Sequence, residues 1–302
     1  MIITLGAGKG SPGVTTVATA LAVAWPGQRV LLEADPAGGD LAFRLSTPGG
    51  GLLAAEPSVL ALAADAREQL PPNALARYAQ DTSLGVPVVL GGVSEQAFAP
   101  MARLWPQVAA QAARWPGTVI ADLGHLHGGN PAAPVAAASG LVLQVTRADV
   151  PEALHHTRAR AGELAARLGQ RPDGGSPLAI VVLCPSVQAE RCVSAVRQVL
   201  AADVTTSSIR VVGYVADDPQ GVQALRAGVL GRRLWGTELM RSAKGLVTTL
   251  SGWCPAPDGN PAQGADSGTA GRASRMLSLA ARVTGEPAGR PRGPSRRWGG
   301  VW

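Results

Sequence analysis

The segment GKGSPGVTT, residues 8–16, lies between an apolar run at Met1–Leu5 and an alanine-rich stretch at Thr15–Trp25. Small residues at such a bend allow backbone N–H groups to surround phosphate oxygens, and the start of the next helix adds a dipole that favours negative charge. The segment therefore predicts a phosphate-binding loop between a first strand and a first helix. Its residues are Gly8, Lys9, Gly10, Ser11, Pro12, Gly13, Val14, Thr15 and Thr16.

Two side chains of this loop carry chemistry. Lys9 is one of only two lysines among 27 basic residues, the other being Lys244. A lysine on a glycine-rich loop of such a lysine-poor chain indicates a role in anion binding. The Thr15 hydroxyl stands where the Ser or Thr of a P-loop ligates Mg²⁺, and Thr15 can also cap the helix.

Outward from the loop, short apolar runs alternate with helical segments along the chain. The runs are almost wholly apolar rather than alternating, so both faces of each strand are expected to be buried, as in parallel α/β sheets. We therefore predict a doubly wound α/β fold, a mostly parallel sheet flanked by helices. The predicted strands are Met1–Leu5, Arg29–Glu33, Gly85–Leu90, Thr118–Asp122, Gly140–Thr146, Leu178–Leu183 and Arg210–Val215.

We predict the helices from apolar residues that recur at helical spacing in the rest of the chain. Pro100 and Pro106 are expected to break the segment Ser94–Trp115, and Asp149 is a plausible cap for the helix that begins at Pro151. The segment Asp35–Asp40 is predicted to be a glycine-containing loop. The predicted helices are Thr15–Trp25, Ser58–Gln69, Ser94–Trp115, Pro151–Leu168, Ala189–Ala201, Gly221–Gly228 and Leu234–Leu250.

Composition excludes several classes of protein. With 302 residues, 46% of them hydrophobic and 16% charged, most of the chain is expected to be globular. Cys184, Cys192 and Cys254 form an odd set without a CxxC pair, which argues against a disulfide framework and gives no zinc or iron–sulfur spacing. The chain begins without a basic signal-peptide region and holds no apolar run of membrane-spanning length, so we expect a cytoplasmic protein.

The charge pattern divides the chain. The formal net charge is +6, and residues 270–302 carry all of it, with seven Arg against Glu286. We predict a folded domain over residues 1–253, a flexible low-complexity linker over 254–271, and a disordered basic tail over 272–302. A short amphipathic helix is a candidate within that tail, at Arg272–Val283.

The loop and its surroundings resemble a known family. KGSPGVTT is similar to KGGxGKTT, the deviant Walker A loop of the ParA/MinD family of P-loop ATPases, whose fold is of the SIMIBI type. The resemblance implies ATP and Mg²⁺ as ligands and a homodimer formed across bound nucleotide. Lys9 matches the family lysine that reaches the partner subunit's phosphates. Val14 replaces the second family lysine, which removes a positive charge and implies weakened hydrolysis.

Two further segments extend the resemblance to the metal and the attacking water. Val30–Asp40 resembles the family pattern VLLIDxDPQGN, so that Asp35 matches the carboxylate that positions water, and Glu33 replaces an aspartate. Val119–Gly124 resembles Walker B, so that Asp122 would hold Mg²⁺ through water. The implied catalytic residues are Lys9 and Asp35, and the implied metal residues are Thr15, Asp35 and Asp122. From the residues alone, Asp35 is also compatible with a simple turn before proline.

The base site is implied by Val212–Pro219, which resembles the family's GxIPxDP segment, whose backbone lies along the adenine. The implied contacts come from Val215, Asp217, Asp218 and Pro219. The family's adenine-reading Asn is absent, since Leu183-Cys184-Pro185 stands there, so adenine and guanine both stay open. Leu141–Pro151 also resembles the family's fifth strand, and the resemblance covers Met1–Leu250.

The histidines fall into two pairs, His125 with His127 and His155 with His156. The pairs could meet as a metal site, but no Cys or carboxylate spacing supports this, and we interpret them as solvated positions.

The resemblance implies an ATP-dependent dimerisation switch that positions DNA, a protein cargo or a cell-surface assembly. The alternative is a non-catalytic scaffold of the TadZ/CpaE type that localises a secretion or pilus system. A relationship to iron–sulfur relatives is disfavoured because their cluster-binding cysteines have no match. The tail is a solvated segment, or it contacts anionic lipid or nucleic-acid phosphates, which would place the protein at a membrane or nucleoid.

Overall fold

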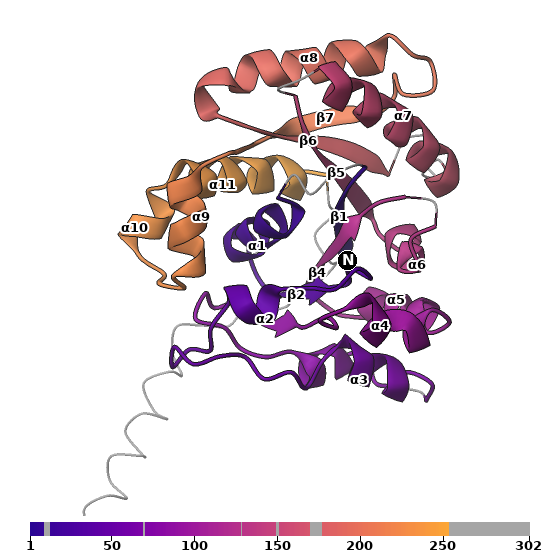
Figure 1. The fold of residues 1–302 in the computed structure, drawn as a ribbon, viewed down its shortest axis with the longest axis vertical. Helices are drawn as coiled ribbons and strands as arrows, with labels where there is room; N and C mark the ends of the chain where they lie inside the picture. Colours follow the sequence, from indigo (N-terminus) through magenta and orange to yellow (C-terminus); the bar gives the residue numbers. More distant parts are fainter. Residues whose placement is uncertain (9–12, 69, 128, 149–150, 170–176, 254–302) are drawn as a thin grey trace, which may run out of the picture. The chain divides into compact units, whose positions relative to one another are not determined.

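A computed structural model describes residues 1–8, 13–68, 70–127, 129–148, 151–169 and 177–253, drawn in colour in Figure 1. The centre is a seven-stranded sheet in the order β3-β2-β4-β1-β5-β6-β7, and every strand pair in it is parallel. The predicted sheet is thus confirmed. The strands are β1 (Ile2–Ala7), β2 (Arg29–Glu33), β3 (Val88–Val89), β4 (Thr118–His125), β5 (Leu141–Arg147), β6 (Leu178–Cys184) and β7 (Arg210–Ala216).

Helices cover both faces of this sheet (Figure 1). The first core contains side chains of α3 (Val59–Asp65), α5 (Trp105–Ala113), α6 (Ala133–Ala137), α7 (Pro151–Leu168) and α8 (Ala189–Ala201). The second contains side chains of α1 (Val14–Ala24), α2 (Leu41–Arg44), α9 (Pro219–Arg226), α10 (Arg232–Trp235) and α11 (Glu238–Ser251). The remaining helical turns are η1 (Ala74–Tyr78), α4 (Glu95–Phe98), η2 (Ala99–Met101) and η3 (Ser186–Gln188).

The strand sequences explain the two cores. Ile2 packs in the first core and Ile3 and Leu5 in the second, and each is at most 1% exposed. Because successive strand side chains point to opposite faces, a strand buried on both sides is apolar at most positions. This is the pattern from which a parallel sheet was predicted.

Several helix predictions were wrong in extent. The break at the two prolines is confirmed, because Ser94–Trp115 divides into α4, η2 and α5. The predicted helix Leu234–Leu250 is two helices, since α10 ends at Trp235 and Thr237 caps α11 through its side-chain oxygen. The predicted helix Ser58–Gln69 ends at Asp65.

Other elements also differ. The predicted strand Gly85–Leu90 is reduced to β3, at the edge of the sheet next to Pro87, which has no N–H to donate. The short helices α2, η1 and α6 were not predicted, because each is a single turn or little more. The predicted Asp149 cap, the linker 254–271 and the tail 272–302 lie outside the described residues. Within the part of the chain that the structure describes, no helix is long and apolar enough to cross a bilayer.

Candidate functional site

The candidate site lies at the carboxyl ends of β1, β2 and β4, the edge at which open parallel sheets bind ligands. Asp122 on β4 is in register with Leu5 on β1 and with Glu33 on β2. Helix α1 begins at Val14, just beyond β1, after Gly13 with a left-handed φ of 90°. The fold therefore brings the predicted loop and both predicted acidic segments to one edge.

Asp122 forms the floor of the site. Its side chain is 1% exposed, Gly124 N–H donates to its Oδ1 at 3.0 Å, and the Thr15 side chain is a further hydrogen-bond partner. Burial raises the pKa of Asp122 to about 6, against these two hydrogen bonds. A desolvated carboxylate beside a hydroxyl is a donor set that suits Mg²⁺, a hard cation that prefers oxygen ligands. The residues present thus fit the metal implied by the resemblance.

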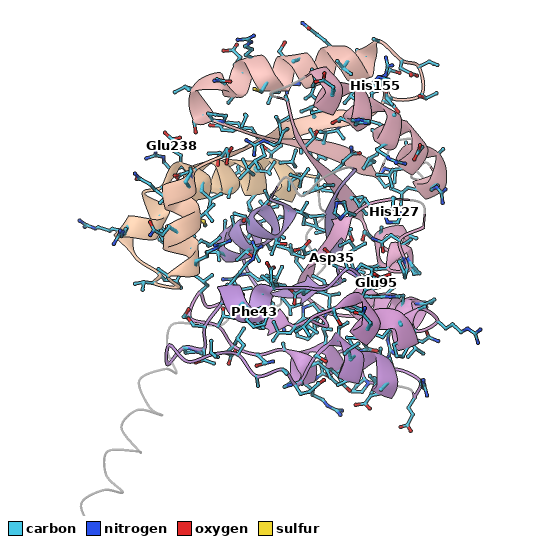
Figure 2. The ribbon with its side chains drawn as sticks, in the orientation of Figure 1. Asp35, Phe43, Glu95, His127, His155 and Glu238 are labelled. Atoms are coloured by element: carbon cyan, nitrogen blue, oxygen red, sulfur yellow. The ribbon has the colours of Figure 1, made fainter. Side chains whose placement is uncertain are left out.

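Asp35 lies beyond the end of β2, half-buried, and it points into the middle of the molecule in Figure 2. Its Oδ1 accepts a hydrogen bond of 3.0 Å from Ala37 N–H. Burial raises the pKa of this carboxyl, and the nearby His125 acts against that shift. Gly124 packs so closely that a Cβ there would lie 1.8 Å from Asp35 Oδ2. The position of Asp35 therefore depends on the glycine.

Asp35 opens onto a cavity of about 380 Å³ that His125, His127 and Glu95 also line. His125 and His127 were interpreted as solvated positions, and they are half-buried and exposed respectively. The structure adds that both line this cavity with Asp35. Among the described residues no group of three or more His, Cys, Asp or Glu side chains is arranged to hold a metal.

Glu33 connects the segments around the site. It is 2% exposed, and its two carboxylate oxygens accept from Leu41 N–H and Gly91 N–H, each at 2.8 Å. Burial raises the pKa of Glu33 to about 7, although both hydrogen bonds lower it. A Cβ on Gly39 would lie 2.0 Å from the Glu33 carboxyl carbon. Glu33 thus fixes the loop after β2, the start of α2 and the loop after β3.

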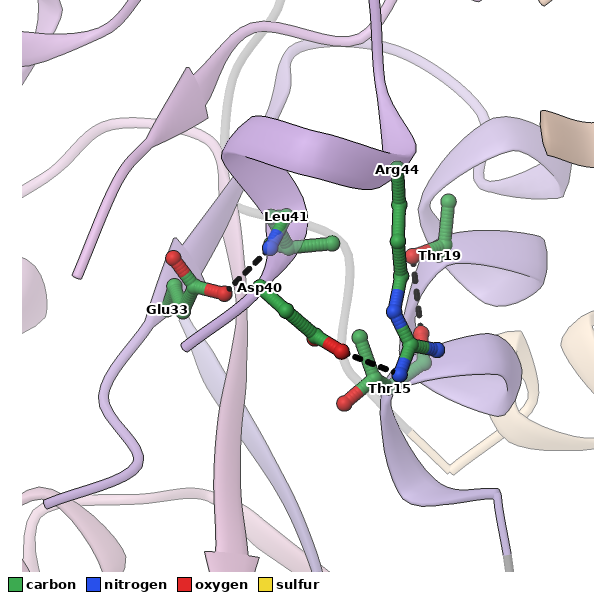
Figure 3. Close-up of polar contacts among 6 residues, drawn as sticks. All are labelled: Thr15, Thr19, Glu33, Asp40, Leu41 and Arg44. Carbon is green, nitrogen blue, oxygen red and sulfur yellow. Dashed lines mark hydrogen bonds and ion pairs between the residues drawn. The ribbon is translucent and has the colours of Figure 1, made fainter. Parts of the chain in front are cut away.

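Arg44 at the end of α2 extends toward the first turn of α1 (Figure 3). Its Nη2 pairs with Asp40 Oδ2 at 2.5 Å, while its buried Nε has no hydrogen-bond partner within the described residues. With Thr15, Thr16 and Thr19 it lines a small cavity. Sequence reasoning missed Arg44, because no helix was predicted over residues 41–44 and only the packing of α2 brings it to α1.

The loop itself is described only at its ends. Val14 is 4% exposed and belongs to the second core, whereas Thr15 and Thr16 are half-buried. A Cβ on Gly8 would lie 2.8 Å from Arg160 Cβ, so the chain passes close to α7 there. Lys9, Gly10, Ser11 and Pro12 lie outside the described residues and stay predictions.

The predicted base segment follows β7. Val215 is completely buried, so its side chain is closed to a ligand. Asp217 forms an ion pair with Arg147 of β5. Asp218 caps α9, whose first residue is Pro219, by accepting from Gly221 N–H at 3.0 Å, and it also accepts from Leu239 N–H at 3.2 Å. Both aspartate side chains are therefore engaged in contacts within the protein.

Comparison with known proteins supports this fold. A ParA-family ATPase from Chlorobium tepidum is 14% identical and superposes with a TM-score of 0.62, over 82% of this chain and 98% of that one. The cell-division ATPase MinD from Pyrococcus furiosus is 18% identical with a TM-score of 0.61, over 84% and 99%. MinD from Pyrococcus horikoshii, crystallised with Mg-ADP, is 17% identical with a TM-score of 0.60, over 85% and 98%.

No protein-family model and no curated protein sequence matches the chain. The structural likeness nevertheless defines a class: the chain has the P-loop fold of the ParA/MinD ATPases. The resemblance noted from the sequence is thus confirmed at the level of the fold.

Proposed function

We propose that the chain is a nucleotide-dependent dimerisation switch of the ParA/MinD type that binds ATP with Mg²⁺ and hydrolyses it slowly. One observation carries the proposal. The Thr15 hydroxyl, the buried Asp122 carboxylate and the half-buried Asp35 carboxylate meet at the carboxyl edge of the sheet, at the start of α1. Solved proteins of this fold include one crystallised with Mg-ADP.

Each residue has a proposed role. Backbone N–H groups of residues 8–16 bind the phosphates, and Thr15 and Asp122 hold Mg²⁺, with Asp35 at the outer side of the metal site. Mg²⁺, when bound, neutralises charge on the phosphate oxygens. Asp35 orients the attacking water, and Lys9 reaches the phosphates of the second subunit. The backbone of Val215, Asp217, Asp218 and Pro219 lies along the base.

A phosphate-release assay tests the catalytic part of this proposal. Asp35→Ala is expected to abolish Mg²⁺-dependent release of phosphate from ATP, because no other side chain is proposed to orient the water. Asp203→Ala is the matched control, since Asp203 is a partly exposed aspartate on the loop after α8, outside the candidate site. Turnover that is equal in both variants would contradict the assignment of Asp35.

A second candidate function is a non-catalytic scaffold that keeps the fold and localises an assembly. One observation favours it: the side chain at position 14 is a buried valine within the core. The same assay separates the two candidates, because a scaffold binds nucleotide without Asp35-dependent turnover.

The proposed partners are a second copy of the chain, joined across bound nucleotide, and a protein cargo or regulator. The basic tail supplies a proposed contact with DNA or with anionic membrane. The proposed location is the cytoplasm, at the nucleoid or the membrane surface.

A further inference from the structure

We propose that Arg44 binds phosphate oxygens of the nucleotide and supplies the positive charge that Val14 does not. The inference depends on the proposed function, because it assumes that a nucleotide binds at the start of α1. It assigns a binding role to a residue of α2, outside the glycine-rich loop.

The charge of the site is the first argument. Its described carboxylates are Glu33, Asp35, Asp40 and Asp122, and the loop contains a single lysine, Lys9. A nucleotide brings further negative charge, which this edge binds only with cations present. The side chain at position 14 lies in the apolar core, so a second cation must come from another element.

The placement of Arg44 is the second argument. Its side chain lines the same small cavity as Thr15 and Thr16, which belong to the first turn of α1. Figure 3 shows the guanidinium next to Thr15, one of the proposed metal residues. Arg44 is thus a described cation at the start of α1.

The hydrogen bonding of Arg44 is the third argument. Its buried Nε has no partner among the described residues, and an unpaired buried donor costs free energy that a suitable acceptor restores. It forms an ion pair with Asp40, whose side chain is 52% exposed, and pairs of this kind contribute little to stability. A guanidinium presents several donors in a fixed fork that matches phosphate oxygens. Arg44 therefore has a donor that the described part of the chain leaves available for an anion.

The test is the affinity of the full chain for ATP with Mg²⁺, measured by calorimetry. Arg44→Gln is expected to weaken binding about tenfold or more, the usual effect of losing a charged hydrogen bond. Arg226→Gln is the matched control, because it removes the same charge from an exposed arginine that lines the same cavity from α9. It is expected to change affinity less than about twofold.

A variant that keeps the charge distinguishes a phosphate contact from a structural effect. Arg44→Lys is expected to bind ATP more tightly than Arg44→Gln, because it keeps a cation at the same position. Thermal unfolding of each variant without nucleotide is measured alongside. Arg44→Gln is expected to unfold close to the wild-type temperature, so its weaker binding is not explained by loss of the fold.

The outcomes separate this inference from the proposed function. Wild-type binding of ATP with unchanged affinity in Arg44→Gln overturns the role of Arg44 and leaves the proposed function standing. Equal losses in Arg44→Gln and Arg226→Gln also overturn it, because the effect is then one of general charge. Failure of the wild-type chain to bind ATP overturns both.

Discussion

At the scale of single residues, the site is built from acids held in place by glycines and backbone donors. Asp122 and Glu33 are both buried, and Asp35 lies against Gly124 without room for a Cβ. Buried carboxylates reduce stability when they are charged. We therefore expect a substitution that removes the charge of Asp122 to affect the stability of the protein and its binding of ligand in different ways.

Asp122→Asn is expected to stabilise the protein without nucleotide at pH 8 while abolishing the effect of Mg²⁺ on nucleotide binding. The pKa of Asp122 is raised from 3.8 to about 6 in the folded state. Wild-type stability therefore falls as the pH rises from about 4 through 6, because the unfolded chain releases the proton first. The expected gain is about 1–3 kcal/mol at pH 8 and vanishes near pH 4. Denaturant unfolding at both pH values measures it, and a loss of stability at pH 8 would contradict this view of Asp122.

Gly124→Ala is expected to displace Asp35 and remove its contribution to turnover. The φ of Gly124 is 59°, and a Cβ there meets Asp35 Oδ2 at 1.8 Å. Gly27→Ala is the matched control, since Gly27 has a φ of 70° but nothing within 4 Å of its Cβ position. Both variants are expected to lose about 1 kcal/mol from backbone strain. Phosphate release that is equally reduced in both would show that the contact with Asp35 is unimportant.

At the scale of elements, the strands were predictable and the short helices of the site were not. The strands are apolar at nearly every position, a signal that does not depend on the rest of the chain. Helix α2 is four residues long, and its first amide is bonded to Glu33 from a different element. No local pattern encodes that contact, which is why Arg44 was missed although Asp35 and Asp122 were predicted.

Glu33→Gln is expected to loosen the connection between β2 and α2. Glutamine offers one acceptor and one donor where Leu41 N–H and Gly91 N–H both require acceptors, so one N–H loses its partner. The expected result is faster hydrogen exchange at those two amides, because an N–H without a partner opens more readily. Glu190→Gln, an exposed change in the first turn of α8, serves as the control. Unchanged exchange at Leu41 and Gly91 would contradict a connecting role for Glu33.

At the scale of the whole molecule, the excess positive charge lies outside the residues predicted to form the folded domain. Residues 1–269 are close to neutral overall, and the excess positive charge lies in residues 270–302. We therefore expect binding of the chain to DNA or to anionic lipid to depend on residues 270–302.

The full chain is expected to bind nonspecific duplex DNA in a salt-dependent manner, and a chain ending at residue 253 is expected to lose this binding. Each arginine that neutralises a phosphate steepens the salt dependence by about one unit of slope, so seven arginines set its upper limit. Fluorescence anisotropy at several salt concentrations measures the slope, and vesicles of anionic lipid form a parallel arm. Equal DNA binding by the full chain and by the chain ending at residue 253 would contradict a role of the tail in binding DNA.

The central claim is that the carboxyl edge of the sheet at β1, β2 and β4 binds a nucleotide through Mg²⁺. The most direct measurement is a titration of the full chain with ATP, with and without Mg²⁺, combined with light scattering to follow the molar mass. We predict saturable binding that is accompanied by a doubling of the mass and that Mg²⁺ strengthens in the wild-type chain but not in Asp122→Asn. ATP binding that is absent, or that is indifferent both to Mg²⁺ and to Asp122→Asn, would contradict the account.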